Sequence, residues 1–94
     1  MTLRTVFQIS LHYAHKMVGF DPELSVEVTG NEILVTLSGT SYSVTYFKPR
    51  GQLWLVGKDM VHEDDPRTAM TSAEFLAKAW KVANDTAKYL GWIV

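Results

Sequence analysis

Four consecutive residues, His62-Glu63-Asp64-Asp65, place one imidazole and three carboxylates together in the chain. These side chains are ligands for divalent metal ions, so a metal-dependent activity at residues 62–65 is one hypothesis. Metal binding requires ligands that converge on one point, whereas adjacent residues usually diverge. The simpler interpretation is a solvated acidic loop before Pro66, in which charge repulsion and hydration keep the side chains apart.

A second pair of imidazoles belongs to His12 and His15, which are three positions apart. If this segment is helical, the spacing places both side chains on one face, where they can bind a single metal ion. No third ligand is identifiable, and a positive charge on His15 also suits the C-terminal end of a helix. We therefore expect two exposed helix residues here, and the sequence assigns no metal or cofactor site.

Aromatic and basic residues gather at Phe47, Lys48, Arg50 and Trp54, in a region that we expect to form strands. On an uncovered sheet face, aromatic rings can stack on bases while cations attract phosphates, as in domains that bind single-stranded nucleic acid. This pattern supports a hypothesis of binding to nucleic acid or to an acidic partner. Leu53 replaces Trp54 in the patch if the register of the strand puts Trp54 on the core face.

The apolar members of this patch also have a structural interpretation. The C-terminal residues Trp92-Ile93-Val94, or a second subunit, would then cover the open face of the sheet. Trp92 is therefore a further candidate for an interface or binding patch.

The composition limits the classes of function. The chain has 94 residues, which is the size of one domain, and we expect residues 1–94 to form a single domain. A formal net charge of −1 argues against a general polyanion binder, which needs a basic excess or a basic stripe. The absence of cysteine excludes disulfides, thiolate zinc sites and thiol nucleophiles.

No catalytic or nucleotide-binding motif is present in the sequence. It contains neither a Gly-x-Ser-x-Gly element nor a glycine-rich phosphate-binding loop, so no catalytic or cofactor-binding residue is assigned. Catalytic residues that only folding brings together leave no such motif, so an enzyme stays an open alternative. Because no targeting segment and no run of ~20 apolar residues is visible, we expect a cytoplasmic protein without a membrane partner.

Two amphipathic helices are the clearest structural pattern, over residues 3–18 and 72–90. At roughly 100° per residue, the apolar side chains of each segment cover more than half of the helix circumference. The first helix ends at Gly19, and the second begins at the N-cap Thr71, with Glu74 completing a capping box. Such wide apolar arcs need more than one neighbour, which favours self-association.

Each helix has one further detail that a structure can test. Residues 7–13 also alternate between apolar and polar types, as in a strand, but the helical arc accounts for a longer segment. In the second helix, Trp80 lies toward the edge of the face that meets the sheet. The residues expected on that face are Leu76, Ala83, Ala87 and Leu90, flanked by Phe75, Ala79 and Val82.

Residues 24–46 predict three antiparallel strands, with two-residue loops at Gly30-Asn31 and Gly39-Thr40. The expected cross-strand pairs are Leu24 with Leu37, Val26 with Val35, Val28 with Ile33, Ile33 with Tyr46, Val35 with Val44, and Leu37 with Tyr42. All of these side chains share one face, and a slip of one residue would move them into water.

A third hairpin follows at residues 48–51, and it has two possible registers. A three-residue bulged loop, which the Pro-x-Gly pattern favours, puts Trp54 and Val56 on the core face. A two-residue loop puts Leu53 and Leu55 there instead. We prefer the bulged loop.

Together these patterns predict an α+β fold in the order α-β-β-β-β-α, a two-layer sandwich with both helices on one face of a four-stranded antiparallel meander. The open sheet face keeps large apolar residues, and exposed apolar surface beyond a few hundred Å² normally marks an interface. The leading hypothesis is a small, non-enzymatic interaction module that forms a homodimer through its helices or its open sheet face. Its expected partner is a second copy or another protein.

Overall fold

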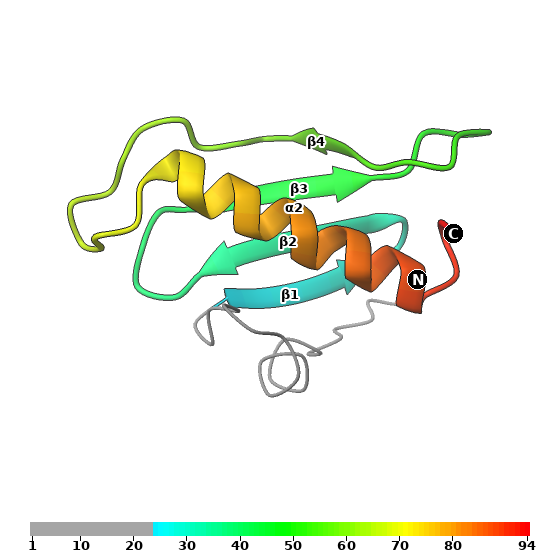
Figure 1. Cartoon of the computed structure of the whole chain (residues 1–94), viewed down its shortest axis with the longest axis horizontal. Coiled ribbons are helices and arrows are strands. Elements are labelled where there is room, and N and C mark those ends of the chain that lie inside the picture. The colour runs from blue at the N-terminus through cyan, green and yellow to red at the C-terminus, as the bar shows by residue number, and fades with distance from the viewer. Residues whose placement is uncertain (1–23) are drawn as a thin grey trace.

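The computed structural model describes residues 24–94 of the chain. This part contains the strands β1 (Leu24–Thr29), β2 (Glu32–Leu37), β3 (Ser43–Phe47) and β4 (Val56–Lys58), followed by the helix α2 (Ser72–Tyr89) (Figure 1). The predicted helix over residues 3–18, its strand alternative, and the pair His12 and His15 lie outside the described residues.

The strands form one antiparallel sheet in sequence order, β1-β2-β3-β4. The predicted register of the first two hairpins is confirmed, since Val26 lies opposite Val35 and Val35 lies opposite Val44. At the last residue of β2, the Leu37 amide donates a hydrogen bond of 3.2 Å to the Tyr42 carbonyl, as the predicted pairing of these two residues requires. Because alternate residues of a strand share a face, this register gathers the large apolar side chains of the sheet on one side.

The preferred register of the third hairpin is wrong. Phe47 lies opposite Val56, so residues 48–55 form a long loop rather than a bulged turn. Leu55 is 3% exposed and belongs to the core, whereas Trp54 is 56% exposed. The burial of Leu55 accounts for the exposure of Trp54, because neighbouring side chains along an extended chain point to opposite sides.

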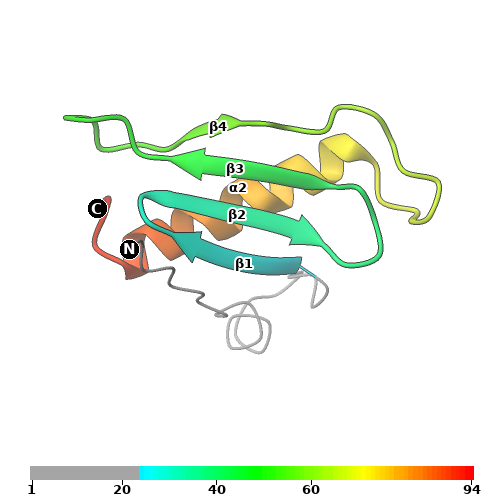
Figure 2. The same cartoon turned by 180° about the vertical axis from the view of Figure 1, so that it is seen from behind.

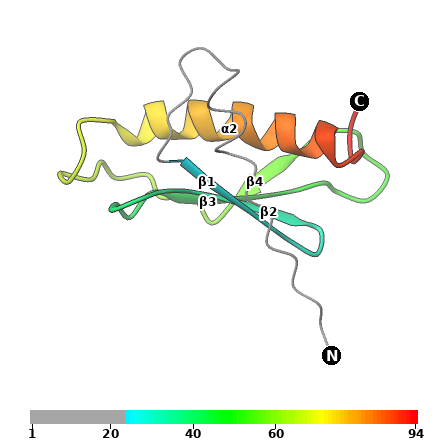
Figure 3. The same ribbon diagram turned by 90° about the horizontal axis from the view of Figure 1, so that it is seen from below.

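The helix α2 lies across one face of the sheet and packs mainly on β2, with smaller contacts to β1 and β3 (Figure 3). Among residues 24–94, no helix covers the other face, which the reverse view shows (Figure 2). The buried residues of the helix are Ser72, Phe75, Ala79, Val82, Ala83, Thr86 and Ala87. Leu76 and Leu90, expected in the central row, are only partly buried beside the core, so α2 is rotated from the predicted orientation.

Both predicted ends of α2 are confirmed. The Thr71 hydroxyl accepts a hydrogen bond of 3.1 Å from the Glu74 amide, and Glu74 Oε1 accepts one of 3.2 Å from the Thr71 amide, which completes the capping box. At the other end, Gly91 has a φ of 79°, and the Trp92 amide donates to the Ala87 carbonyl over 2.8 Å. This turn directs the C-terminal residues back toward the core.

The described residues therefore have an α+β architecture, with a four-stranded antiparallel sheet and a C-terminal helix packed on one of its faces. Across residues 24–94, no helix combines the length and apolar character needed to cross a membrane.

Candidate functional site

The sheet face opposite α2 is where the sequence predicted a binding patch. Serine, threonine and glutamate side chains occupy much of this face, together with the apolar side chains of Leu34, Phe47 and Val56. An open hollow of about 320 Å³ lies on it, and its lining consists of Glu27, Thr29, Glu32, Leu34 and Thr45. The lining contains no basic side chain, so the hollow offers no positive charge to a phosphate or another anion.

An ion pair crosses the open face, between Lys58 on β4 and Glu32 on β2. The Lys58 Nζ atom lies 5.5 Å from the centroid of the Phe47 ring, which is a cation–π contact. The hydrogen bond to Glu32 raises the pKa of Lys58 above its usual value. The Lys58 side chain therefore lies over the open face of the sheet, and the Glu32 carboxylate of the same chain neutralises its charge.

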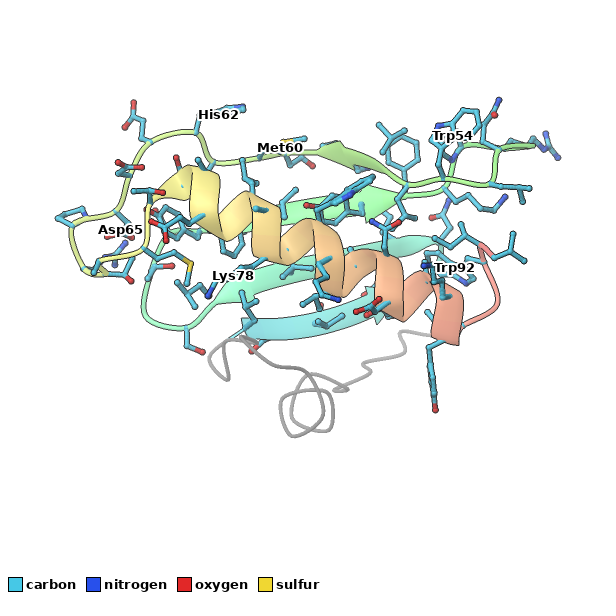
Figure 4. All side chains as sticks on the ribbon, in the orientation of Figure 1. Trp54, Met60, His62, Asp65, Lys78 and Trp92 are labelled. Carbon is cyan, nitrogen blue, oxygen red and sulfur yellow. The ribbon has the colours of Figure 1, made fainter. Side chains whose placement is uncertain are left out.

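The predicted patch residues are divided between two places. Phe47 is half-buried on the open face, whereas Arg50 and Trp54 are exposed in the hairpin loop 48–55, which projects beyond the sheet (Figure 4). Leu53, in the same loop, is 64% exposed. The structure thus places a basic and aromatic group on the hairpin rather than across the sheet.

Lys48 has a structural role in that hairpin. Its Nζ atom donates a hydrogen bond of 2.9 Å to the Gln52 carbonyl, while the Gln52 amide donates to the Pro49 carbonyl over 3.1 Å. Gly51 has a φ of 77°, a left-handed conformation that glycine adopts without steric cost. These contacts give the loop a defined shape, with Arg50 at the turn.

Trp92 lies apart from this patch, at the C-terminal end of α2 (Figure 4). Its side chain is half-buried against the core, and Ile93 is a core residue. The C-terminal residues therefore pack on the helix side of the sheet, and the interpretation in which they cover the open face is wrong.

Exposed apolar side chains gather along β4. Among residues 24–94, the exposed large hydrophobic residues in or beside this strand and its hairpin are Leu53, Trp54, Val56, Met60 and Trp80. Trp80 belongs to α2 but lies close to β4. Its ring is 5.7 Å from the ring of Tyr46, and Tyr46 is paired with Gly57 of β4. β4 is the last strand of the sheet, so its outer side has no strand partner among the described residues. We define the β4 edge as Val56, Gly57, Lys58, Met60 and Trp80.

A buried carboxylate holds the connection between β4 and α2. Asp65, which is 4% exposed, accepts hydrogen bonds from the Ser41 amide at 2.7 Å and from the Arg67 guanidinium at 2.9 and 2.7 Å. The Tyr42 hydroxyl accepts a bond of 2.9 Å from the Asp65 amide and donates one of 2.8 Å to the Met70 carbonyl. Arg67, followed by the Ser41 amide, holds the pKa of Asp65 well below its usual range.

The other members of the acidic segment do not join Asp65 in a metal site. Asp64 Oδ1 accepts a hydrogen bond of 2.8 Å from the Ser72 amide, and the His62 carbonyl accepts one of 3.0 Å from the Ser72 hydroxyl. Asp64 therefore places negative charge at the N-terminus of α2, where the helix dipole favours it. In the part of the chain that the structure describes, no group of three or more histidine and acidic side chains could hold a metal ion.

Sequence reasoning missed two features of this surface. The apolar run at residues 53–56 signals that one face of β4 stays exposed, but it does not show which one. The Asp65 anchor leaves only a weak signal, the Asp-x-Arg spacing, because Ser41 and Tyr42 are distant in the chain.

Comparisons of the chain with protein-family models, with curated proteins and with solved structures found no match. Function is therefore inferred from the surface itself. Within residues 24–94, that surface combines an apolar strand edge, a cationic hairpin and an acidic connection.

Proposed function

We propose that this protein is a small interaction module rather than an enzyme, and that it functions as a homodimer. The observation that supports this most is the gathering of exposed large hydrophobic residues beside β4. Single exposed hydrophobic residues are normal on a monomer, whereas contiguous ones mark an interface. A two-fold dimer would cover the same strip on both chains at once.

The molecular mass in solution tests this proposal. Sedimentation equilibrium over a range of micromolar concentrations should give a species of twice the chain mass of 10.6 kDa, in equilibrium with the monomer. A mass of 10.6 kDa at every concentration would contradict the homodimer.

We also propose that residues 3–18 form a helix beside α2, which would complete the α-β-β-β-β-α sandwich. The amphipathic pattern of the segment supports this, as does the position of α2, which packs mainly on β2 rather than over the whole sheet. Backbone chemical shifts measured by NMR should be helical over residues 3–18. Strand-like shifts over residues 7–13 would refute this layout.

A second candidate function is binding of single-stranded nucleic acid or an acidic partner at the hairpin. It is favoured by one observation, the exposure of Arg50 and Trp54 in a loop that contains no carboxylate. Arg50→Glu should then abolish binding of a fluorescent oligonucleotide at low salt, whereas Lys88→Glu, a charge reversal at the end of α2, should leave it unchanged. No binding by the natural chain at low salt would remove this candidate.

A further inference from the structure

We propose that two copies of this chain pair through the β4 edge, with their β4 strands antiparallel about a two-fold axis at Gly57. This inference rests on the proposed homodimer and specifies its geometry. An unpaired edge strand presents a row of backbone donors and acceptors that a second strand can satisfy. The pairing would continue the sheet of one subunit into the other, with both α2 helices on the same face.

Lys58 is the residue that would ordinarily prevent such pairing. Edge strands often carry a lysine whose charge blocks the approach of another strand. Here the ammonium is drawn across the open face to Glu32 and over the Phe47 ring, with Nζ 5.5 Å from the ring centroid. The charge is neutralised within the chain, and Val56 stays exposed beside it. The edge therefore does not repel its own copy.

On the helix side of the edge, Gly57 makes room for its neighbours. A Cβ atom at this position would lie 2.6 Å from Cε of Met60, so the methionine occupies the space that a side chain would fill. Trp80 lies nearby, with its ring against Tyr46. An axis at Gly57 brings Met60 and Trp80 of both chains together above the paired strands, where sulfur–aromatic contacts are favourable.

The register follows from the charges and from the end of the strand. Pairing centred on Lys58 would place two lysines directly opposite each other, which is destabilising. Asp59 has a φ of 54°, a left-handed conformation that ends β4 at Lys58. Gly57, the middle residue of β4, is thus the centre that avoids both problems, and it places Val56 opposite the partner's Lys58.

Charge complementarity identifies a second copy as the partner. The hairpin with Lys48 and Arg50 lies at one end of the β4 edge, and the acidic residues 63–65 lie at the other, as the labelled Trp54, His62 and Asp65 show (Figure 4). Antiparallel pairing places the hairpin of each chain beside the acidic segment of the other. Arg50 and Glu63 are both exposed, so each Arg50 can approach the partner's Glu63. The contact occurs twice, once at each end of the interface.

A charge-swap experiment tests this geometry. The dissociation constant of the dimer is measured by sedimentation equilibrium for the natural chain and for Arg50→Glu and Glu63→Lys. Each single reversal turns two attractive contacts into repulsive ones, so each should weaken the dimer about tenfold. An equimolar mixture of the two variants should form heterodimers with the natural affinity, because both contacts are then attractive again. Lys88→Glu, which changes the same charge away from the edge, serves as the control.

The outcomes separate this inference from the proposed function. Weakening by both reversals, rescue in the mixture and no effect of Lys88→Glu support pairing at the β4 edge. A dimer that both reversals leave as tight as Lys88→Glu does would refute the edge geometry and leave the homodimer standing. A natural chain that is monomeric at all concentrations refutes both proposals, and an extended peptide from another protein would then be the occupant of this edge.

Discussion

Replacing Tyr42 by phenylalanine tests how the connection between β4 and α2 is held. The substitution keeps the buried ring and its stacking on Phe75, 5.2 Å away between centroids, but removes the hydroxyl. That hydroxyl accepts a hydrogen bond from the Asp65 amide and donates one to the Met70 carbonyl. Tyr42→Phe therefore leaves two backbone groups without their partner.

The expected cost follows from the burial of those two groups. A buried backbone group without a hydrogen bond costs about 1–3 kcal/mol. The Asp65 amide is buried, whereas Met70 is only half-buried, so water can replace part of the bond to its carbonyl. We expect Tyr42→Phe to lower the free energy of unfolding by about 2 kcal/mol in total. In a domain of this size, that loss lowers Tm by about 8–16 °C.

Thermal and urea unfolding, followed by circular dichroism, would measure this loss. Tyr46→Phe is the matched control, because Tyr46, a residue of β3, is also a buried tyrosine, yet its hydroxyl forms no hydrogen bond with the described residues. The control should stay within about 0.5 kcal/mol of the natural chain. Hydrogen exchange at the Asp65 amide should also become faster in Tyr42→Phe. Equal stability of the two variants would refute the role assigned to the Tyr42 hydroxyl.

Three further measurements probe the fold. The pKa of Asp65 is lowered in the folded state, chiefly by Arg67, so its contribution to stability is present above the unfolded value of 3.8 and is lost as the pH falls below it. The fall in Tm between pH 5 and about pH 2 should therefore be shallower for Asp65→Asn, and parallel curves would contradict a stabilising ion pair between Asp65 and Arg67. Burial raises the pKa of Tyr46 from its unfolded value of 10.0 to about 12, so this residue contributes stability that is fully present below pH 10 and is lost as the pH rises through 12. Ultraviolet titration should find one phenol ionising near pH 12 that is absent in Tyr46→Phe, and a variant with an unchanged titration curve would exclude Tyr46 as that group. Leu55→Ala should cost about 2–4 kcal/mol of unfolding free energy and Leu53→Ala less than about 0.5, and the reverse order would contradict the core position of Leu55.

The register of the first two hairpins was predictable because apolar residues recur at every second position, which is also the spacing at which side chains of a strand return to the same face. Val26 and Val44 each lie between polar residues, whereas Val35 has Leu34 on one side. All three valines still belong to the same two-residue repeat, and two short loops leave no freedom to shift one strand against the next. A single error would have moved all of these side chains into water. The sheet is thus specified by the alternation within each strand, and also by the loss of all core contacts at once if one strand shifts by a residue.

The third hairpin lacked such a constraint. Residues 53–56 are all apolar, so either register buries two large side chains and exposes two others. The choice depends on how Leu55 fits beneath α2 and on the hydrogen bond from Lys48 to the Gln52 carbonyl, neither of which has a sequence signature. The β4 edge shares this ambiguity, since the preferred register predicted Val56 on the core face, whereas it is exposed on the opposite face.

The acidic segment is a different case. Its sequence has the residue types of a metal site, but in the structure these carboxylates bond to groups of the protein. Asp65 bonds to Ser41 and Arg67, and Asp64 bonds to the first amide of α2. Ser41 is 24 positions away from Asp65, and a contact at that separation depends on the completed sheet. Adjacent carboxylates therefore indicated where the charge lies, although they could not indicate what it binds.

The distribution of charge along the molecule connects the two binding hypotheses drawn from the sequence. A net charge of −1 hides a separation in which the cationic hairpin and the acidic connection lie at opposite ends of one strand edge. In the sequence alone, the hairpin suggested a polyanion as ligand and the acidic segment suggested a metal ion, although the described residues contain no group that could hold one. Related by a two-fold axis at Gly57, each supplies the charge that the other attracts. Added salt should accordingly weaken the dimer, since exposed charges are screened beyond about 8–10 Å, whereas a dimer formed by the apolar helix faces alone would tighten or stay unchanged.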